Sequence, residues 1–142
     1  MPLCSPALLS GKDKLQTPAD LRHHDLLHVL GYEEGWAIWL KAAGVKDISP
    51  GQGLQFDNSL MAYKVAAVGA GVALGRSSMF QDELTSGRLV APFDLSVPVQ
   101  EGFYLLSPTQ GSGHPDAKLF RDWILDQAQS DYHNSTKQPV LN

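Results

Sequence analysis

The 142-residue chain contains a single cysteine, Cys4, and no apolar run long enough to cross a bilayer. One cysteine cannot form an internal disulfide, and Cys4 lacks the partner cysteines of a zinc or redox motif. A membrane-spanning helix needs about 20 apolar residues, so we expect a soluble protein with no membrane partner. The first residues also lack the basic and then apolar segments of a secretory signal, which predicts a cytoplasmic location.

Positive charge is also scarce. The chain has 11 Lys and Arg against 15 Asp and Glu, a formal net charge of -4. Binding a nucleic-acid backbone requires clustered Lys and Arg that displace counterions. We therefore expect that this chain alone does not hold DNA. Its 43% hydrophobic and 18% charged residues are typical of a globular protein of about one domain.

Catalytic and metal-binding motifs are missing as well. No serine lies in a G-x-S-x-G pattern, and no oxyanion signature accompanies Cys4. The densest group of potential metal ligands is His23, His24, Asp25 and His28. The apolar residues from Leu26 onward predict a strand, which would turn His24 and His28 apart. We expect no metal, no cofactor and no enzymatic activity; a small thiol enzyme using Cys4 is the less favoured alternative.

Residues 65–75 read VAAVGAGVALG, and their glycines resemble a phosphate-binding loop. A dinucleotide loop requires a strand, then the glycines, then a helix, because the phosphate binds at the amino end of the helix. Here the predicted order is helix, glycine turn, strand. The third glycine of G-x-G-x-x-G would fall at position 74, which is Leu74. We therefore interpret Gly69 and Gly71 as a helix terminus.

The hydrophobic pattern predicts an α/β fold with helices on both faces of a sheet. Helical turns are expected to begin at Pro6 and Pro18. Longer helices are expected at 33–43, 60–68, 78–86 and 115–129, and the helix 60–68 is apolar enough to be buried on most sides. Strands are expected at 26–30, 54–56, 72–74, 88–90 and 101–107, the last of them central in the sheet. Residues 130–142 are expected to form a disordered tail.

Two strand ends offer groups that could bind a small ligand, because ligands of open α/β sheets lie beyond the carboxyl ends of the strands. The first segment is Phe56, Asp57, Asn58 and Ser59, which leads from a strand into a helix. The second is Gly75 and Arg76, where the arginine could grip an anion. Plain helix capping by the first segment and a solvated turn arginine in the second are equally open interpretations.

Several motifs, taken in order, resemble the effector-binding domain of LysR-type transcriptional regulators, in the branch that contains the glycine-cleavage regulator. In the first part they are Cys4-Ser5-Pro6-Ala7-Leu8-Leu9, Pro18-x-Asp20-Leu21, Leu26-Leu27-His28 and Trp36-x-x-Trp39-Leu40-x-x-Ala43-Gly44. Further on they are Phe56-x-x-Ser59, Ala66-Ala67-x-Gly69-x-Gly71-Val72-Ala73-Leu74, Glu83-Leu84-x-x-Gly87-Arg88-Leu89-Val90-x-Pro92-Phe93, Tyr104-x-Leu106 and Phe120-x-x-Trp123-Ile124. The resemblance covers about residues 3 to 125.

The resemblance implies a periplasmic-binding-protein-like (type II) domain, in which two lobes hold a small effector between them. Residues 1–5 would be one crossover strand, 6–100 the second lobe, and 101–129 the return crossover strand and carboxy-terminal helix. The ligand-binding residues would be the two strand-end segments together with Ser5 of the first crossover. The chain would act as part of a transcription regulator, as a homo-oligomer.

A complete regulator of this family also has an amino-terminal helix-turn-helix and a first lobe, and neither is recognisable in this sequence. We therefore expect a truncated effector domain that contacts DNA only through a missing helix-turn-helix and carries only half of the effector pocket. The helix 115–129 would lack its usual partner, so its apolar face, Phe120, Trp123 and Ile124, would be exposed or buried against another chain. A free-standing solute-binding module is the alternative.

Overall fold

The computed structural model describes residues 1–32, 34–76, 80–98, 104–106 and 114–135 of the chain. They divide into two compact units, Met1–Pro98 and Val99–Asn142. In chain order the elements are β1 (Pro2–Leu3), η1 (Pro6–Leu9), η2 (Pro18–His23), β2 (Leu26–Val29), α1 (Gly35–Ala42), β3 (Leu54–Phe56), α2 (Ser59–Ala67), β4 (Val72–Leu74), α3 (Gln81–Thr85) and α4 (Pro115–Ser135), where η marks a 3-10 helix. Within these described ranges, no helix combines the length and apolar character of a membrane span.

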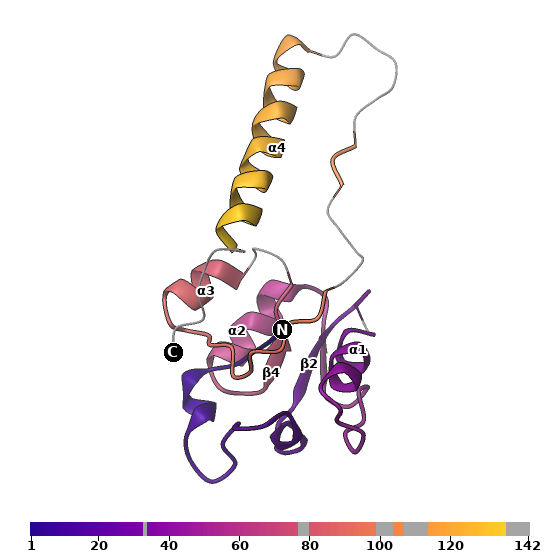
Figure 1. Cartoon of the computed structure of the whole chain (residues 1–142), viewed down its shortest axis with the longest axis vertical. Helices are drawn as coiled ribbons and strands as arrows, with labels where there is room; N and C mark the ends of the chain where they lie inside the picture. Colours follow the sequence, from indigo (N-terminus) through magenta and orange to yellow (C-terminus); the bar gives the residue numbers. More distant parts are fainter. Residues whose placement is uncertain (33, 77–79, 99–103, 107–113, 136–142) are drawn as a thin grey trace. The chain divides into compact units, whose positions relative to one another are not determined.

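The first unit is built on a four-stranded sheet with the order β1-β4-β2-β3 (Figure 1). Strands β4, β2 and β3 are parallel, whereas β1 pairs antiparallel with β4 and forms one edge. Pro2 has no amide proton to donate, and an edge strand tolerates this. The apolar run of β2 is buried on both faces, because Leu26 packs against α1 residues and Leu27 against α2 residues, as is usual for a parallel strand.

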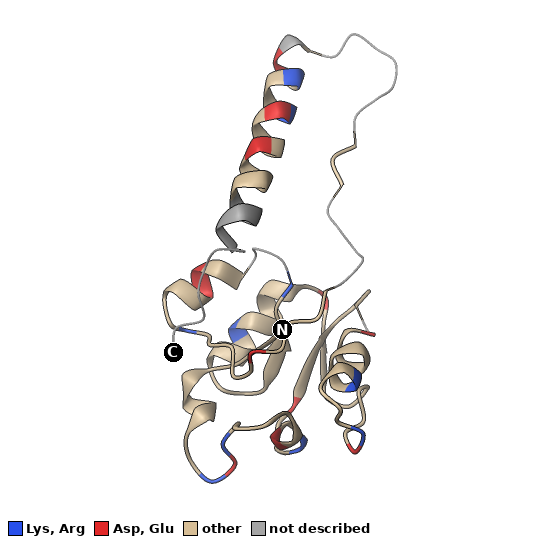
Figure 2. Ribbon diagram, viewed as in Figure 1, with Lys and Arg blue, Asp and Glu red and all other residues tan. Residues whose placement is uncertain are grey.

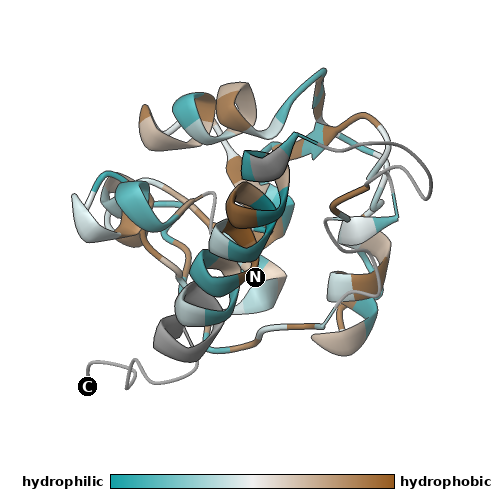
Figure 3. Cartoon of the chain, turned by 90° about the horizontal axis from the view of Figure 1, so that it is seen from above, coloured by the Kyte–Doolittle hydropathy of each residue, from teal (hydrophilic) through white to brown (hydrophobic). Residues whose placement is uncertain are grey.

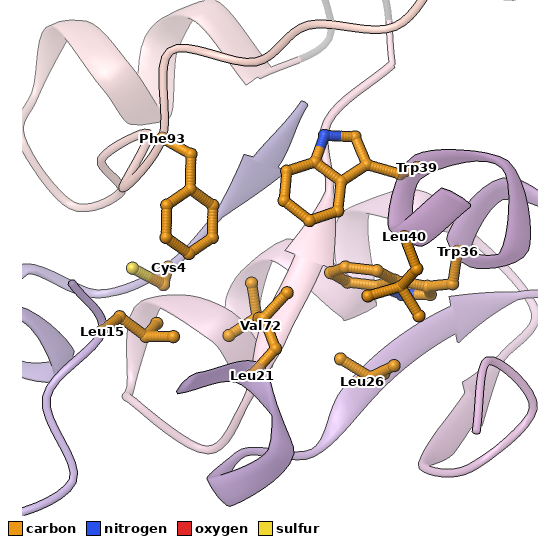
Figure 4. Packing of buried hydrophobic residues seen from close by; sticks show 9 residues of the cluster. All are labelled: Cys4, Leu15, Leu21, Leu26, Trp36, Trp39, Leu40, Val72 and Phe93. Atoms are coloured by element: carbon orange, nitrogen blue, oxygen red, sulfur yellow. The ribbon is translucent and has the colours of Figure 1, made fainter. Parts of the chain in front are cut away.

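Side chains of the strands alternate between the two faces of the sheet, and each face has its own hydrophobic cluster. Leu26 and Val72 point to one face, where they join Trp36, Trp39 and Leu40 of α1 (Figure 4). The rest of this cluster consists of Cys4, Leu15, Leu21 and Phe93. On the other face the cluster consists of Leu3, Leu27, Ala62, Tyr63, Ala66, Ala73 and Leu89, with α2 supplying three of them. The prediction of helices on both faces is therefore confirmed.

Glycines end both of the longer helices in this unit, and for α2 this confirms the prediction. Gly44 follows α1 with φ 73°, and Gly69 follows α2 with φ 82°, in the left-handed region that favours glycine. At Gly71, φ is 150° and an added Cβ would lie 2.7 Å from the carbonyl oxygen of Asp25. The order α2, glycine turn, β4 is the reverse of a dinucleotide loop, so this prediction is also confirmed.

Three predictions for the first unit need correction or narrowing. No strand forms at 88–90; only Val90 makes an isolated bridge, to Cys4. Helix α2 is not buried on most sides, because Leu60 and Met61 are about half exposed and only one face packs on the sheet. In the predicted helix 78–86, residues 81–85 are helical and Gly87 closes the turn with φ 70°, whereas positions 78 and 79 lie outside the described residues.

In the second unit, α4 extends to Ser135, so the expected disordered tail is wrong for residues 130–135. Residues 136–142 lie outside the described ranges. Acidic and basic residues are interspersed along α4 (Figure 2), and apolar and polar residues are mixed along it (Figure 3). Phe120 and Trp123 stack with ring centroids 5.9 Å apart, and each is more than half exposed. The predicted strand 101–107 is not formed at 104–106, and its other positions are outside the described residues.

Candidate functional site

The parallel strands β2, β3 and β4 all end at one edge of the sheet, which we call the carboxyl edge. Residues 30–32 follow β2, residues 57–59 follow β3, and residues 75–76 follow β4. The Leu30 amide donates to the Phe56 carbonyl oxygen at 2.9 Å, so the first two segments leave the sheet together. The structure thus brings Phe56–Ser59 and Gly75–Arg76 to the same edge, as ligand sites of open α/β sheets require.

The corner between β3 and α2 is fixed by Asn58. Its Oδ1 accepts the amide proton of Met61 at 3.0 Å, which makes Asn58 the N-cap of α2. Its Nδ2 donates to Asp57 Oδ1 at 2.7 Å, so the amide orients the exposed carboxylate beside it. Ser59 is the first helical residue and is half-buried. The capping interpretation is correct for Asn58, and Asp57 and Ser59 remain available for other contacts.

Gly75 lets β1 lie close to the end of β4. Its amide donates to the Met1 carbonyl oxygen at 2.8 Å. An added Cβ would come within 2.5 Å of Leu3 Cδ1, closer than real side chains approach. A side chain at this position would force the side chains of Leu3 and Phe80 to move, so glycine permits the close packing of β1 as the chain leaves the sheet toward Arg76.

Tyr63 links the two segments, and the sequence analysis did not identify it. Its hydroxyl accepts the amide proton of Arg76 at 3.2 Å, and the side chain of Ser59 acts to lower the pKa of the phenol. The side chain is 1% exposed, and this burial is the main reason why the pKa of Tyr63 is raised. The available signal was its spacing, because Tyr63 lies four residues after Ser59 and so on the same helix face.

Tyr32 is a second residue that the sequence analysis missed. The Arg76 guanidinium carbon lies 4.1 Å from the centroid of the Tyr32 ring, a cation–π contact that holds the side chain over the segment after β2. Ligands of open α/β sheets lie beyond the carboxyl ends of the strands, and Tyr32 follows the carboxyl end of β2, so the sequence could have identified it. With it, each of the three parallel strands contributes to the carboxyl edge.

Ser5 does not join this group. Because β1 runs antiparallel to β4, with Pro2 opposite Leu74, residue 5 lies beyond the amino end of β4. A Cβ at Gly69, at the carboxyl end of α2, would be 4.0 Å from Ser5 Cβ, and the Ser5 hydroxyl caps η1 by accepting the Ala7 amide at 3.4 Å. The structure therefore places Ser5 at the opposite edge of the sheet from the other predicted site residues.

The histidine-rich segment lies at that opposite edge, beside a cavity of about 280 Å³. Its lining includes Arg22, His23, His24, Asp25, Asp47 and Gln52. His24 Nε2 contacts the Asp13 carbonyl oxygen at 2.7 Å, and His28 Nε2 contacts the Gln52 carbonyl oxygen at 3.0 Å. The two histidines thus have different partners, as the strand prediction requires. Across the described ranges, no three His, Cys, Asp or Glu side chains are grouped to hold a metal.

Cys4 has the environment of a structural thiol. It is fully buried in the hydrophobic cluster that packs between the sheet and α1, with Trp36, Trp39 and Leu40, and burial raises its pKa to about 11. The thiolate is the nucleophilic form of cysteine, so a raised pKa makes Cys4 a poor nucleophile near neutral pH. The structure therefore does not support the thiol-enzyme alternative.

Comparison with known proteins places this geometry in context. The family model of the LysR substrate binding domain matches residues 1–129. The glycine cleavage system transcriptional activator of Escherichia coli K12 is 37% identical over 131 residues, covering 92% of this chain and 43% of that protein. The HTH-type transcriptional activator AmpR of Rhodobacter capsulatus is 37% identical over 127 residues, covering 89% of this chain and 42% of that protein. The chain thus spans about two-fifths of the length of these curated relatives.

Solved structures show the same similarity. The effector domain of the transcriptional regulator AmpR of Pseudomonas aeruginosa superposes with a TM-score of 0.75 at 28% identity, covering 97% of this chain and 64% of that chain. The AmpR effector binding domain from Citrobacter freundii gives a TM-score of 0.70 at 29% identity, covering 91% and 62%. The predicted effector-domain fold is confirmed by these likenesses.

Proposed function

Because the chain belongs to the LysR substrate binding domain family, we propose that it supplies the effector-sensing part of a LysR-type transcriptional regulator. Its ligand is a small polar metabolite, and its output is a change in transcription made by the whole regulator. The relatives are transcription regulators, and Cys4 is a poor nucleophile, so the proposed role is sensing rather than catalysis.

The observation that supports this proposal best is the link between the two predicted segments. Tyr63 lies in the first part of α2, and its hydroxyl accepts the Arg76 amide proton, so α2 and the end of β4 form one continuous wall at the carboxyl edge. Free amide groups at a helix start and a guanidinium both favour a negatively charged group. The class of ligand that fits this wall is a small carboxylate-bearing metabolite.

The remaining parts of the proposal follow from the family. Effector binding is completed by a second lobe, so this chain alone binds weakly, and lobe closure carries the signal toward the DNA. The exposed apolar residues of α4, among them Phe120 and Trp123, favour association with another lobe or another copy. We propose a homo-oligomeric regulator that works in the cytoplasm.

The wall can be tested by NMR on the 142-residue chain. Amino acids and short dicarboxylic acids are titrated while the backbone amide shifts are followed. We expect the amides of Asn58, Ser59, Gly75 and Arg76 to shift together, with an affinity in the millimolar range typical of half a site. The Arg76→Gln variant should weaken these shifts. Shifts confined to the cavity at the opposite edge, around Arg22 and Gln52, would contradict the proposed site.

DNA binding gives a second prediction. The chain carries a formal net charge of -4, so we expect no mobility shift of genomic fragments flanking its gene when it is tested alone at moderate salt. A random-sequence duplex serves as the control. Tight and sequence-specific retardation by the chain alone would show that it reads DNA itself, and would contradict the proposed division of roles.

A free-standing solute-binding module would use the same wall, so ligand titration does not separate it from the regulator. The coding sequence immediately upstream does. A helix-turn-helix in the same reading frame supports the regulator, whereas a complete second lobe without one supports the binding module.

A further inference from the structure

Resting on the proposed function, we propose that Tyr32 is a positioning residue that holds the guanidinium of Arg76 in place for a planar carboxylate. The guanidinium carbon lies over the Tyr32 ring, 4.1 Å from its centroid. A guanidinium held in this way selects a carboxylate, whose two oxygens match its paired N–H groups, over a spherical anion such as chloride. The segment after β2 thereby contributes to recognition through Arg76.

The backbone of Tyr32 is fixed on both sides. Its amide donates to the Val29 carbonyl oxygen at 3.0 Å, and its own carbonyl oxygen accepts the Gly35 amide proton at 3.1 Å. Two residues earlier, the bond from the Leu30 amide to the Phe56 carbonyl oxygen ties the same segment to the end of β3. The aromatic ring therefore extends from a hydrogen-bonded turn at the carboxyl edge.

Arg76 is held at its backbone by a different tyrosine. Its amide donates to the Tyr63 hydroxyl at 3.2 Å, and Tyr63 is 1% exposed, so this acceptor is fixed by the packing around it. Strand β4 pairs directly with β2, so the Arg76 side chain only has to reach the end of the neighbouring strand. Both ends of the arginine, its backbone amide and its guanidinium, thus contact an aromatic residue of the fold.

These two contacts order the arginine before a ligand arrives. A long arginine side chain loses conformational entropy when a ligand fixes it, and a side chain that is already held loses less. A cation–π contact engages the face of the guanidinium, whereas its N–H groups point outward in its plane. A carboxylate binds in that plane, so the ring and the ligand do not compete for the same position.

A spherical anion provides the contrast that isolates this role. Chloride is attracted by the charge of Arg76 but does not depend on how the guanidinium is turned, whereas a carboxylate depends on both. Replacing Tyr32 by Leu or Phe leaves the charge of Arg76 itself unchanged. Loss of the ring should therefore weaken the binding of a carboxylate more than that of chloride.

The test is an exchange titration on the 142-residue chain, in which sodium chloride is replaced stepwise by sodium acetate at constant ionic strength. NMR shifts of the Ser59 and Arg76 amides give the acetate-over-chloride preference, and upfield ring-current shifts of the Arg76 side-chain protons report the contact with the ring. We expect Tyr32→Leu to abolish the ring-current shifts and to lower the preference about two- to fivefold, the contribution of one exposed cation–π contact. Tyr32→Phe retains the ring and should keep both at the wild-type level.

Two further variants separate the possible failures. Ile38→Ala truncates a side chain that is 42% exposed, close to the 39% of Tyr32, and should leave the preference unchanged. Arg76→Lys keeps the positive charge but loses the paired N–H groups, so it should remove the preference. If Arg76→Lys removes the preference but Tyr32→Leu leaves it unchanged, the role of Tyr32 is overturned and the proposed site stands. If neither this exchange nor the carboxylate titration described above shifts the amides of the wild-type chain, the site itself fails.

A folding control keeps the result interpretable. If Tyr32→Leu does not unfold cooperatively, Tyr32→Trp tests the same contact in the opposite direction, because an indole attracts a cation more strongly than a phenol does. We expect it to retain the ring-current shifts and to raise the acetate-over-chloride preference. A preference that stays unchanged or falls in Tyr32→Trp overturns the proposal.

Discussion

The two faces of the sheet are packed by helices of different composition. On the α1 side, Trp36 and Trp39 meet at 6.1 Å with planes at 82°, and Trp39 stacks on Phe93 at 5.5 Å. On the α2 side, the helix offers Ala62 and Ala66 with a single large residue, Tyr63. One face is therefore a layer of large apolar side chains, and the other a close contact made by small ones.

The polar groups of the large side chains are used differently on the two faces of the sheet. Each indole on the α1 side has its N–H satisfied within the fold, Trp36 by the Leu27 carbonyl oxygen at 3.2 Å and Trp39 by the Leu95 carbonyl oxygen at 3.1 Å. On the α2 side the large residue, Tyr63, instead places its hydroxyl at the carboxyl edge, where it accepts the Arg76 amide proton. The α1 face contributes mainly buried apolar area, whereas the α2 face positions the proposed site.

The largest effect is expected on the α1 face. Trp36→Ala should lower the free energy of unfolding by about 3–5 kcal/mol, because it opens a cavity under a side chain that is 1% exposed. Urea denaturation followed by circular dichroism measures it. Ile38→Ala on the same helix, where the side chain is 42% exposed, should cost less than about 1 kcal/mol. Equal losses from the two variants would contradict the division between the faces.

A smaller effect is expected from crowding the α2 face. Ala66 is fully buried against the sheet, so Ala66→Leu should cost about 1–3 kcal/mol and should also move the Arg76 amide resonance, because α2 carries Tyr63. Ala37→Leu on the exposed side of α1 is the matched control and should change neither quantity. A stable Ala66→Leu variant with an unmoved Arg76 resonance would show that α2 and the sheet are not closely packed at Ala66.

The capping role of Asn58 can be separated from any ligand role. Asn58→Ala should destabilise the chain by about 1 kcal/mol through loss of the bond to the Met61 amide. Asn58→Ser retains an oxygen that can cap the helix and should restore most of this loss. If Asn58→Ser restores stability but not the carboxylate-induced NMR shifts, the amide contributes to binding as well as to the cap.

The smallest effect concerns η2, which covers the α1 face through Leu21. The Asp20 carboxylate accepts the amides of Thr17 at 2.7 Å and Gln16 at 3.1 Å, and these bonds hold the pKa of Asp20 below its usual value. A lowered folded-state pKa stabilises above the unfolded value and is lost as pH falls through the folded one. Asp20→Asn should therefore be destabilising at about pH 6 and progressively less so toward about pH 2.5. A constant difference between variant and wild type would exclude this linkage.

Much of the fold could be predicted because local patterns decide it. The apolar run of β2, the glycine after each of α1 and α2, and the helix-glycine-strand order at Gly69 and Gly71 all follow from short stretches of sequence. The strand expected at 88–90 was wrong because alternation alone does not supply a pairing partner; only Val90 finds one, in Cys4. The helix beyond residue 129 was missed because a helix needs no apolar periodicity to continue its backbone hydrogen bonds.

The candidate site was predicted only in part. Strand ends and helix starts are visible in the sequence, so Asp57 to Ser59 and Gly75 to Arg76 were placed at one edge correctly, whereas their role as ligand contacts stays a prediction. Tyr63 was missed because a tyrosine one turn inside a helix looks like any core residue. The position of Ser5 could not be foreseen because it depends on the antiparallel pairing of β1.

The pairing of β1 with β4 also affects how the molecule is made. Pro2 and Leu3 leave the ribosome well before their partners, Leu74 and Ala73. Contacts between residues so far apart in sequence form only after a large loop has closed, and closing that loop costs conformational entropy. During synthesis the first strand must wait, with its backbone unpaired, until the chain beyond Leu74 has emerged, and only then is the segment around Gly75 locked into place.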